Sequence, residues 1–304
     1  MQKVIKNKKI KEKSILTQRV SVGEKIFFGV MAVFCAIYAF SLAFPVFWLL
    51  LKSVEDPGAY LFNRNLHGWL YVTDVIHWEN YANAFTRIQD KGVNFFGMLT
   101  NSIWWVGIGT FQSIFWHATT AYIVSKYRFV GRNFLYNLVI INALIPVYGT
   151  GGAGYKLIND LGLYDQGPIY LIMTTFGGLG GSFLTMVGLF RGISWEYAEA
   201  VYIDGGGDTT VYFKIMLPQA MPMLSALAVS SAVGLWNNYN GPLVYLPSTP
   251  TVASGLYKVS LTIERAGYPI YFCGLVFTLI PVMICYAFIA EKMMTNLSIG
   301  GLKG

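Results

Sequence analysis

Charged residues are scarce in this sequence of 304 residues. Asp, Glu, Lys and Arg together make up 12% of the chain, whereas 55% of the residues are hydrophobic. An ordinary soluble domain carries roughly twice that share of charge, about 25%. The composition therefore argues against a water-soluble enzyme.

Cysteines and the common catalytic motifs are also few or missing. The three cysteines, Cys35, Cys273 and Cys285, all fall in apolar stretches, where a thiol behaves as a small apolar side chain. No Gly is directly followed by Lys, so the phosphate-binding pattern Gly-x-x-x-x-Gly-Lys-Ser/Thr is absent. His-Glu-x-x-His, Cys-x-x-Cys and a plausible Ser/His/Asp order are missing as well. We therefore expect no catalytic residue, no metal site and no cofactor in this chain.

Long stretches without charge are what the sequence does contain. A helix that crosses a bilayer needs about 20 apolar residues. Each of the following ranges exceeds that length and lacks Asp, Glu, Lys and Arg: 26–51, 92–125, 133–155, 166–190, 215–257 and 266–290. The pattern predicts a polytopic membrane protein.

The expected fold is all-α, with six transmembrane helices. A basic tail over 1–25 precedes one membrane domain over 26–304. The expected spans are about 26–51, 101–125, 133–149, 167–190, 219–237 and 269–290. The pair Asn101-Ser102 marks the start of the second span, and the glycine-rich run 149–154 ends the third. In the fourth, we interpret Gly177 and Gly181 as a face for close helix packing rather than a gating kink.

The distribution of Lys and Arg predicts the orientation. If the N-terminus is cytoplasmic, 15 of the 22 basic residues fall on the cytoplasmic side. Lys and Arg are retained on that side of the membrane. Both termini are therefore expected in the cytoplasm of a multi-pass cell-membrane protein. Contact with anionic lipid accounts for the net charge of +7 without nucleic acid.

The expected spans contain no carboxylate. A proton- or sodium-coupled carrier usually needs ionisable groups near the middle of the membrane. His117 lies within the second span, and without a carboxylate partner we interpret it as a hydrogen-bonding residue between helices rather than a proton relay. The energy for transport is therefore expected to come from another polypeptide.

The longest cytoplasmic loop, 192–218, carries the most informative pattern. Ser194 can cap a helix whose first turns contain Glu196 and Glu199, and glycines follow at 205–207. A helix of about ten residues on this pattern is too short to be stable alone. One face of it is expected to dock into a groove of a partner protein. That expected face consists of Trp195, Ala198, Glu199, Tyr202 and Ile203.

This loop resembles the EAA loop of binding-protein-dependent ABC transporter permeases. The family pattern is Glu-Ala-Ala, three residues, Gly, nine residues and Ile-x-Leu-Pro. The chain has Glu199-Ala200, Gly205 and Ile215-Met-Leu-Pro218 with both gaps as in the pattern, and departs from it only at Val201. Because Val201 is bulkier than the usual Ala, it affects how tightly the loop is expected to dock and not the expected role of the loop.

The resemblance extends to the MalG-type permeases of carbohydrate importers. It is carried by Ile203-Asp-Gly205, Trp236-Asn-x-x-x-x-Pro242, His77-Trp-Glu-Asn-Tyr81, Asn101-Ser102 and Gly301-Leu-Lys-Gly304. The resemblance implies six spans and a short cytoplasmic coupling helix. It also implies a second, different permease subunit, an ATPase pair that binds ATP and Mg, an extracytoplasmic solute-binding protein and a sugar substrate.

Two groups of residues follow as candidate sites. The residues expected to couple the chain to the ATPase are Glu196, Glu199, Ala200, Asp204, Gly205, Ile215, Leu217 and Pro218. The candidate substrate path near the outer end of the fifth span is Trp236, Asn237, Tyr239 and Asn240, whose rings and amides suit sugar rings and hydroxyls. The same four residues also fit an interfacial aromatic belt.

The expected function is that of a permease subunit of an ATP-driven carbohydrate importer, with an oligosaccharide as the substrate. Such a subunit is not itself an enzyme, because ATP hydrolysis takes place in a separate chain. The alternatives are an ABC importer permease for a non-sugar solute and an ion-coupled secondary carrier.

Overall fold

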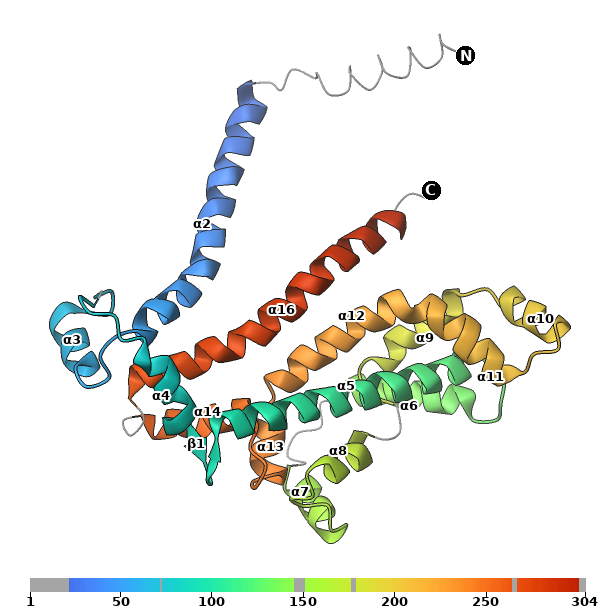
Figure 1. Cartoon of the computed structure of the whole chain (residues 1–304). Helices are drawn as coiled ribbons and strands as arrows, with labels where there is room; N and C mark the ends of the chain where they lie inside the picture. Colours follow the sequence, from blue (N-terminus) through green and yellow to red (C-terminus); the bar gives the residue numbers. More distant parts are fainter. Residues whose placement is uncertain (1–21, 72, 145–150, 176–178, 264–266, 301–304) are drawn as a thin grey trace. The chain divides into compact units, whose positions relative to one another are not determined.

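The computed structural model describes residues 22–71, 73–144, 151–175, 179–263 and 267–300 (Figure 1). The described chain divides between Lys52 and Ser53 into two compact units. Its helices are α2 (Val22–Ser53), α3 (Tyr60–His67), α4 (Glu79–Arg87), α5 (Phe95–Lys126), α6 (Arg132–Leu144), α7 (Gly151–Asp160), α8 (Pro168–Thr175), α9 (Phe183–Gly192), α10 (Glu196–Ile203), α11 (Asp208–Thr210), the π-helix η1 (Val211–Met216), α12 (Leu217–Trp236), α13 (Asn240–Tyr245), α14 (Val252–Leu261) and α16 (Tyr268–Gly300). The strands β1 (Gln89–Asp90) and β2 (Val93–Asn94) form an antiparallel hairpin.

The first unit consists largely of α2. This helix has 32 residues, its apolar window has a mean hydropathy of 2.3, and none of that window is buried. A helix that is apolar on every side is typical of a membrane span. By length and composition, three of the described helical segments could cross a membrane: Val22–Ser53, Asp208–Trp236 and Tyr268–Ala287.

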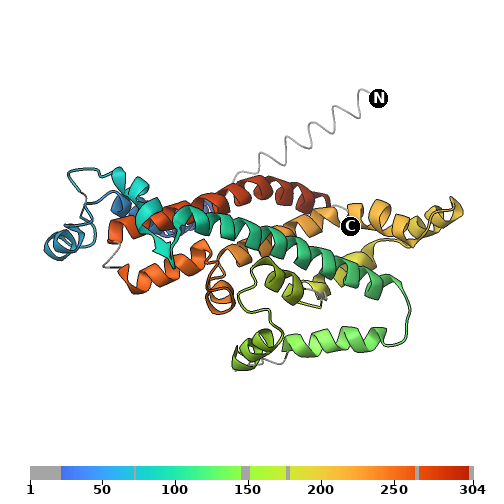
Figure 2. The same ribbon diagram turned by 60° about the horizontal axis from the view of Figure 1, so that its bottom comes forward.

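In the second unit, α5 is the central helix. Figures 1 and 2 both show α12 running along it, and α8 and α9 also pack against it. Its start lies upstream of the predicted Asn101-Ser102, because the Asn94 side chain accepts the Gly97 N–H at 2.9 Å and caps the helix there. Asn101 and Ser102 instead join α5 to the segment before α14. The Asn101 amide donates to the Pro250 carbonyl, and the Ser102 hydroxyl accepts the Val252 N–H.

The fourth predicted span is not one continuous helix. Residues 179–182 are non-helical and separate α8 from α9, because glycines there lower the propensity for helix. The Gly180 N–H donates to Nε2 of His117 on α5 at 2.8 Å, which satisfies a backbone group that an unbroken helix would pair internally.

The glycine prediction for this span was also wrong in detail. The close approach is at Gly180, where a Cβ would meet the His117 ring, whereas a Cβ at Gly181 would meet nothing within 4 Å. Gly177 lies outside the described residues. His117 does bond between segments, but its partner is the break before α9 rather than a second helix.

The third predicted span corresponds to α6, and residues 145–150 lie outside the described part of the chain. The glycine-rich run was predicted to end a helix, but α7 begins at Gly151 and includes Gly152 and Gly154. Glycines in a first turn cost less than glycines in a helix interior, because four N–H groups there have no helical partner in any case. The stretch between the fifth and sixth predicted spans likewise contains α13 and α14.

Candidate functional site: the segment between α9 and α12

The segment that follows α9 forms a separate short helix, α10, beyond the ends of α5 and α12 (Figure 1). The Ser194 hydroxyl accepts the Glu196 N–H at 3.3 Å just before the helix. Both Glu196 and Glu199 lie in the first turn, where carboxylates oppose the positive end of the helix dipole. The helix has eight residues, close to the ten predicted.

Gly205 ends α10. Its φ of +78° lies in the left-handed region that favours glycine. The Gly205 N–H donates to Tyr202 O at 3.1 Å, and the Gly206 N–H donates to Val201 O at 2.8 Å. This pair of bonds is the Schellman arrangement that satisfies the last carbonyls of a helix.

The predicted docking face is not a single surface. Ala198 is fully buried, and Trp195 packs edge-to-face against Tyr127 with the ring centroids 5.9 Å apart. Both belong to a core formed by α5, α6, α9, η1 and α12. The exposed surface, which we call the outer face of α10, consists of Glu196, Tyr197, Glu199, Ala200, Tyr202 and Ile203. The prediction was wrong for Ala198 and Trp195, which pack inward, whereas the other three predicted residues are exposed. Spacing defines a face of the helix but not which side the rest of the protein covers.

Asp208, which the sequence reasoning did not single out, fastens the end of this segment. Its Oδ1 accepts hydrogen bonds from the Tyr202 hydroxyl at 2.6 Å and the Tyr127 hydroxyl at 2.8 Å. These bonds, first that from Tyr202, hold the pKa of the Asp208 carboxyl below its usual value. The same bond to Asp208 raises the pKa of Tyr202. Asp208 therefore joins α10 to the residue that follows α5.

The hydrogen bonds continue into α5. The Tyr127 hydroxyl is 3.2 Å from that of Tyr122, and Thr119 bonds to the Tyr212 hydroxyl of η1 at 2.9 Å. The Lys126 ammonium donates to the Ile193 carbonyl just before α10. The sequence does not indicate these partners, because most of them come from segments far apart in the chain.

The second half of the loop is helical and leads directly into α12. Ile215 and Leu217 are half-buried, and Pro218 is exposed in the first turn of α12. A proline has no N–H for the usual i to i−4 bond, and the wider π-helical turn of η1 precedes it. Ile215, Leu217 and Pro218 thus form the base of α12, whereas Asp204 caps α10 and is exposed.

At the far end of α12, part of the predicted substrate path lines a cavity of about 250 Å³. Trp236, Asn237 and Tyr239 contribute to its wall together with Tyr257 and Tyr271, and Asn240 does not. Tyr239 stacks on Tyr257 with centroids 4.5 Å apart, and the Trp236 indole N–H donates to the Thr278 carbonyl at 3.2 Å. The cavity wall is therefore largely aromatic. The Asn237 side chain adds an amide to it, and the N–H group of that amide donates to Val233 O.

None of the residues lining this cavity carries a formal charge; the ten are Trp236, Asn237, Tyr239, Ala253, Leu256, Tyr257, Ser260, Tyr271, Leu275 and Thr278. Within the described ranges, no three His, Cys, Asp or Glu side chains gather as metal ligands would. The arrangement suits a neutral ligand with hydroxyl groups and apolar ring faces.

Comparison with known proteins gives relatives over nearly the whole chain, although no family model matches it. The arabinooligosaccharide transport permease AraQ of Halalkalibacterium halodurans is 29% identical over 271 residues, covering 88% of this chain and 94% of that protein. The diacetylchitobiose uptake permease NgcG of Streptomyces coelicolor is 25% identical, covering 84% of this chain and 82% of that protein.

A solved structure shares the fold. It is that of a bacterial ABC transporter involved in the import of the acidic polysaccharide alginate. The match has a TM-score of 0.72 at 24% identity and covers 90% of this chain and 99% of the other. With its EAA pattern on and beside α10, the chain is similar over most of its length to permease proteins of carbohydrate ABC importers.

Proposed function

We propose that this chain forms half of the translocation pore of an ATP-driven carbohydrate importer and that α10 is its coupling helix. The observation that carries the proposal is that α10 presents an exposed outer face while its inner side is fixed in the core of the permease. The proposed partners are a second, different permease, an ATPase pair that binds ATP and Mg, and an extracytoplasmic solute-binding protein. Six spans and cytoplasmic termini complete the proposed topology.

Motion at α10 can reach the pore through α12. The base of α12 adjoins η1, and η1 is bonded to α5 through Tyr212 and Thr119. The helix then runs 20 residues, about 30 Å, to Trp236 in the cavity wall. ATP-driven closure of an ATPase dimer against α10 would therefore tilt a rigid element whose other end lines the cavity.

The proposed substrate is an oligosaccharide. Support comes from the aromatic, uncharged cavity and from relatives named for arabinooligosaccharides, diacetylchitobiose and maltodextrin. Uptake of labelled neutral oligosaccharides, and their stimulation of ATP hydrolysis by the complete complex, would support this assignment. Stimulation by a non-sugar solute alone would contradict it, and uptake without any ATPase would indicate a secondary carrier.

Glu199→Ala tests the coupling role. Glu199 is exposed on the outer face of α10, so its loss leaves the core of the permease unchanged. A charge-assisted hydrogen bond contributes about 1.5–3 kcal/mol, so we expect ATPase binding to weaken roughly tenfold or more and uptake to fall with it. The measurements are ATPase co-purification and sugar uptake in proteoliposomes.

The matched control is Asp160→Ala, which removes an equally exposed carboxylate at the end of α7. We expect this variant to keep both activities. Normal uptake and ATPase binding in Glu199→Ala would remove the coupling assignment.

A further inference from the structure

The turn between α5 and α6 combines positive charge with exposed apolar side chains. Arg128 is exposed and Arg132 half-exposed, while Phe129 is 39% and Val130 fully exposed. Gly131, with φ +90°, allows the chain to reverse here. Apolar side chains beside arginines are unfavourable in water but typical of a membrane surface.

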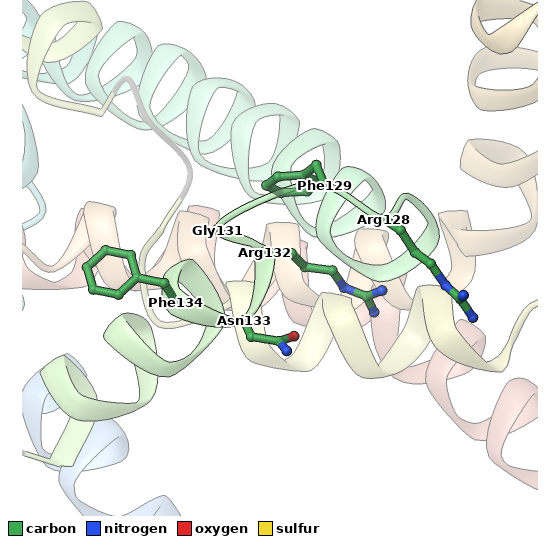
Figure 3. A pocket seen from close by; sticks show the side chains of 6 residues that line it. All are labelled: Arg128, Phe129, Gly131, Arg132, Asn133 and Phe134. Atoms are coloured by element: carbon green, nitrogen blue, oxygen red, sulfur yellow. The ribbon is translucent and has the colours of Figure 1, made fainter.

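An open hollow of about 480 Å³ lies at this turn, lined by Arg128, Phe129, Gly131, Arg132, Asn133 and Phe134. Figure 3 shows the side chains of Arg128, Arg132 and Asn133 directed to one side, with Phe134 pointing away from them. No acidic residue lines the hollow. Among the described residues, neither arginine takes part in an ion pair, and Arg132 has only a long bond of 3.5 Å to Ser125 O.

An apolar stripe leads away from the hollow along α6. Phe134, Leu138 and Ile141 follow at spacings of four and three, and their exposed fractions are 68%, 41% and 54%. Side chains at these spacings lie on one side of a helix. Tyr136 lies one turn beyond Arg132 on α6. The Arg191 guanidinium lies over the Tyr136 ring, 4.8 Å from its centroid, and adds a third positive charge near this end of α6.

We infer that this turn binds an anionic phospholipid. The phosphate occupies the hollow between Arg128 and Arg132, whose planar guanidinium groups suit phosphate oxygens, and the Asn133 amide is placed to donate beside them. An acyl chain lies along Phe134, Leu138 and Ile141. The inference rests on the proposed topology, which places this turn at the cytoplasmic membrane surface.

The site adjoins the coupling segment. Tyr127, which holds Asp208, precedes Arg128 directly in the chain. A lipid bound here fixes the end of α5 against which α10 is fastened, so transport is expected to require anionic lipid.

The experiment uses the complete transporter complex, purified and reconstituted with equal amounts of phosphatidylglycerol and phosphatidylcholine. Native mass spectrometry counts the lipids that each complex retains. We expect the wild type to prefer phosphatidylglycerol and the Arg128→Gln/Arg132→Gln variant to retain at least threefold less of it. Arg128→Lys/Arg132→Lys keeps the charge and should retain an intermediate amount, which separates loss of binding from failure to fold.

The matched control is Lys156→Gln, which removes a single exposed cation on α7 and should leave retention unchanged. Equal retention of the two lipids by the wild type, or wild-type retention by the double glutamine variant, overturns the site. Loss of the ATPase with unchanged lipid retention also overturns it, since the turn would then contact a protein. Failure of the proposed topology would be recognised separately, because a membrane-impermeant maleimide would then label Val130→Cys in intact cells.

Discussion

At Asp208, one carboxylate oxygen accepts hydrogen bonds from two tyrosines that belong to different elements. Tyr202 lies on α10 and Tyr127 follows α5, so the carboxylate fixes the position of α10 relative to α5. Hydrogen bonds to a charged acceptor are stronger than those between neutral groups. The orientation of α10 therefore depends on the ionised form of a residue outside the EAA pattern.

We expect Asp208→Asn to lower stability in a pH-dependent way. The pKa of Asp208 is depressed in the folded protein, so its contribution is fully present above the ordinary pKa of Asp, about 3.9. That contribution is lost as the pH falls through the depressed folded-state value. The variant should therefore melt at a lower temperature than the wild type at pH 7, and the gap should close in strongly acidic buffer.

The measurement is the Tm of the purified complex between pH 7 and pH 3. Tyr202→Phe removes the main cause of the shift and should act in the same direction as Asp208→Asn. Tyr38→Phe, on α2 and outside the proposed docking face, removes an exposed hydroxyl; it is the control and should match the wild type. A gap that stays constant across the pH range would show that the charge of Asp208 does not fasten the segment.

At the scale of elements, local sequence signals predicted where α10 begins and ends better than they predicted which of its side chains are buried. Ser194, Glu196 and Gly205 predicted α10 closely, because a cap, the helix dipole and a left-handed glycine act within a few residues. They could not predict that Ala198 faces inward, because the covering side chains come from α5 and η1.

The break between α8 and α9 has the same explanation. The glycines predicted close helix packing rather than a break, and the hydrogen bond that stabilises the break comes from His117, 63 residues earlier in the chain. The lining of the cavity at the end of α12 could be anticipated only in part for a similar reason, since Tyr257 and Tyr271 reach it from α14 and α16.

Gly205→Ala is expected to disturb the end of α10. A Cβ in the left-handed region costs roughly 1–2 kcal/mol per residue, which the short helix can avoid only by unwinding its last turn. Sugar uptake should fall while membrane insertion stays normal. Gly207→Ala is the matched control, because Gly207 has φ −103° and a Cβ there would meet nothing within 4 Å; equal uptake by the two variants would contradict a special role for Gly205.

At the scale of the whole molecule, one long helix connects the two candidate sites. The run from Asp208 to Trp236 is helical throughout and begins at the residue that fastens α10. It ends in the cavity with uncharged, aromatic walls. Coupling and substrate contact are thus proposed for opposite ends of one continuous helical segment, and the proposal requires that its Asp208 end lie on the cytoplasmic side of the membrane.

The sidedness of the chain can be measured with single cysteines. Cys35, Cys273 and Cys285 are first replaced by alanine, and cysteine is then introduced at Val130, in the fully exposed turn before α6, or at Asp160, at the exposed end of α7. The retention of Lys and Arg in the cytoplasm predicts that a membrane-impermeant maleimide labels Asp160→Cys in intact cells. Val130→Cys should react only after permeabilisation. The reverse pattern would put α10 outside the cell, where no ATPase could reach it, and both the coupling role of Glu199 and the cytoplasmic lipid site would have to be abandoned together.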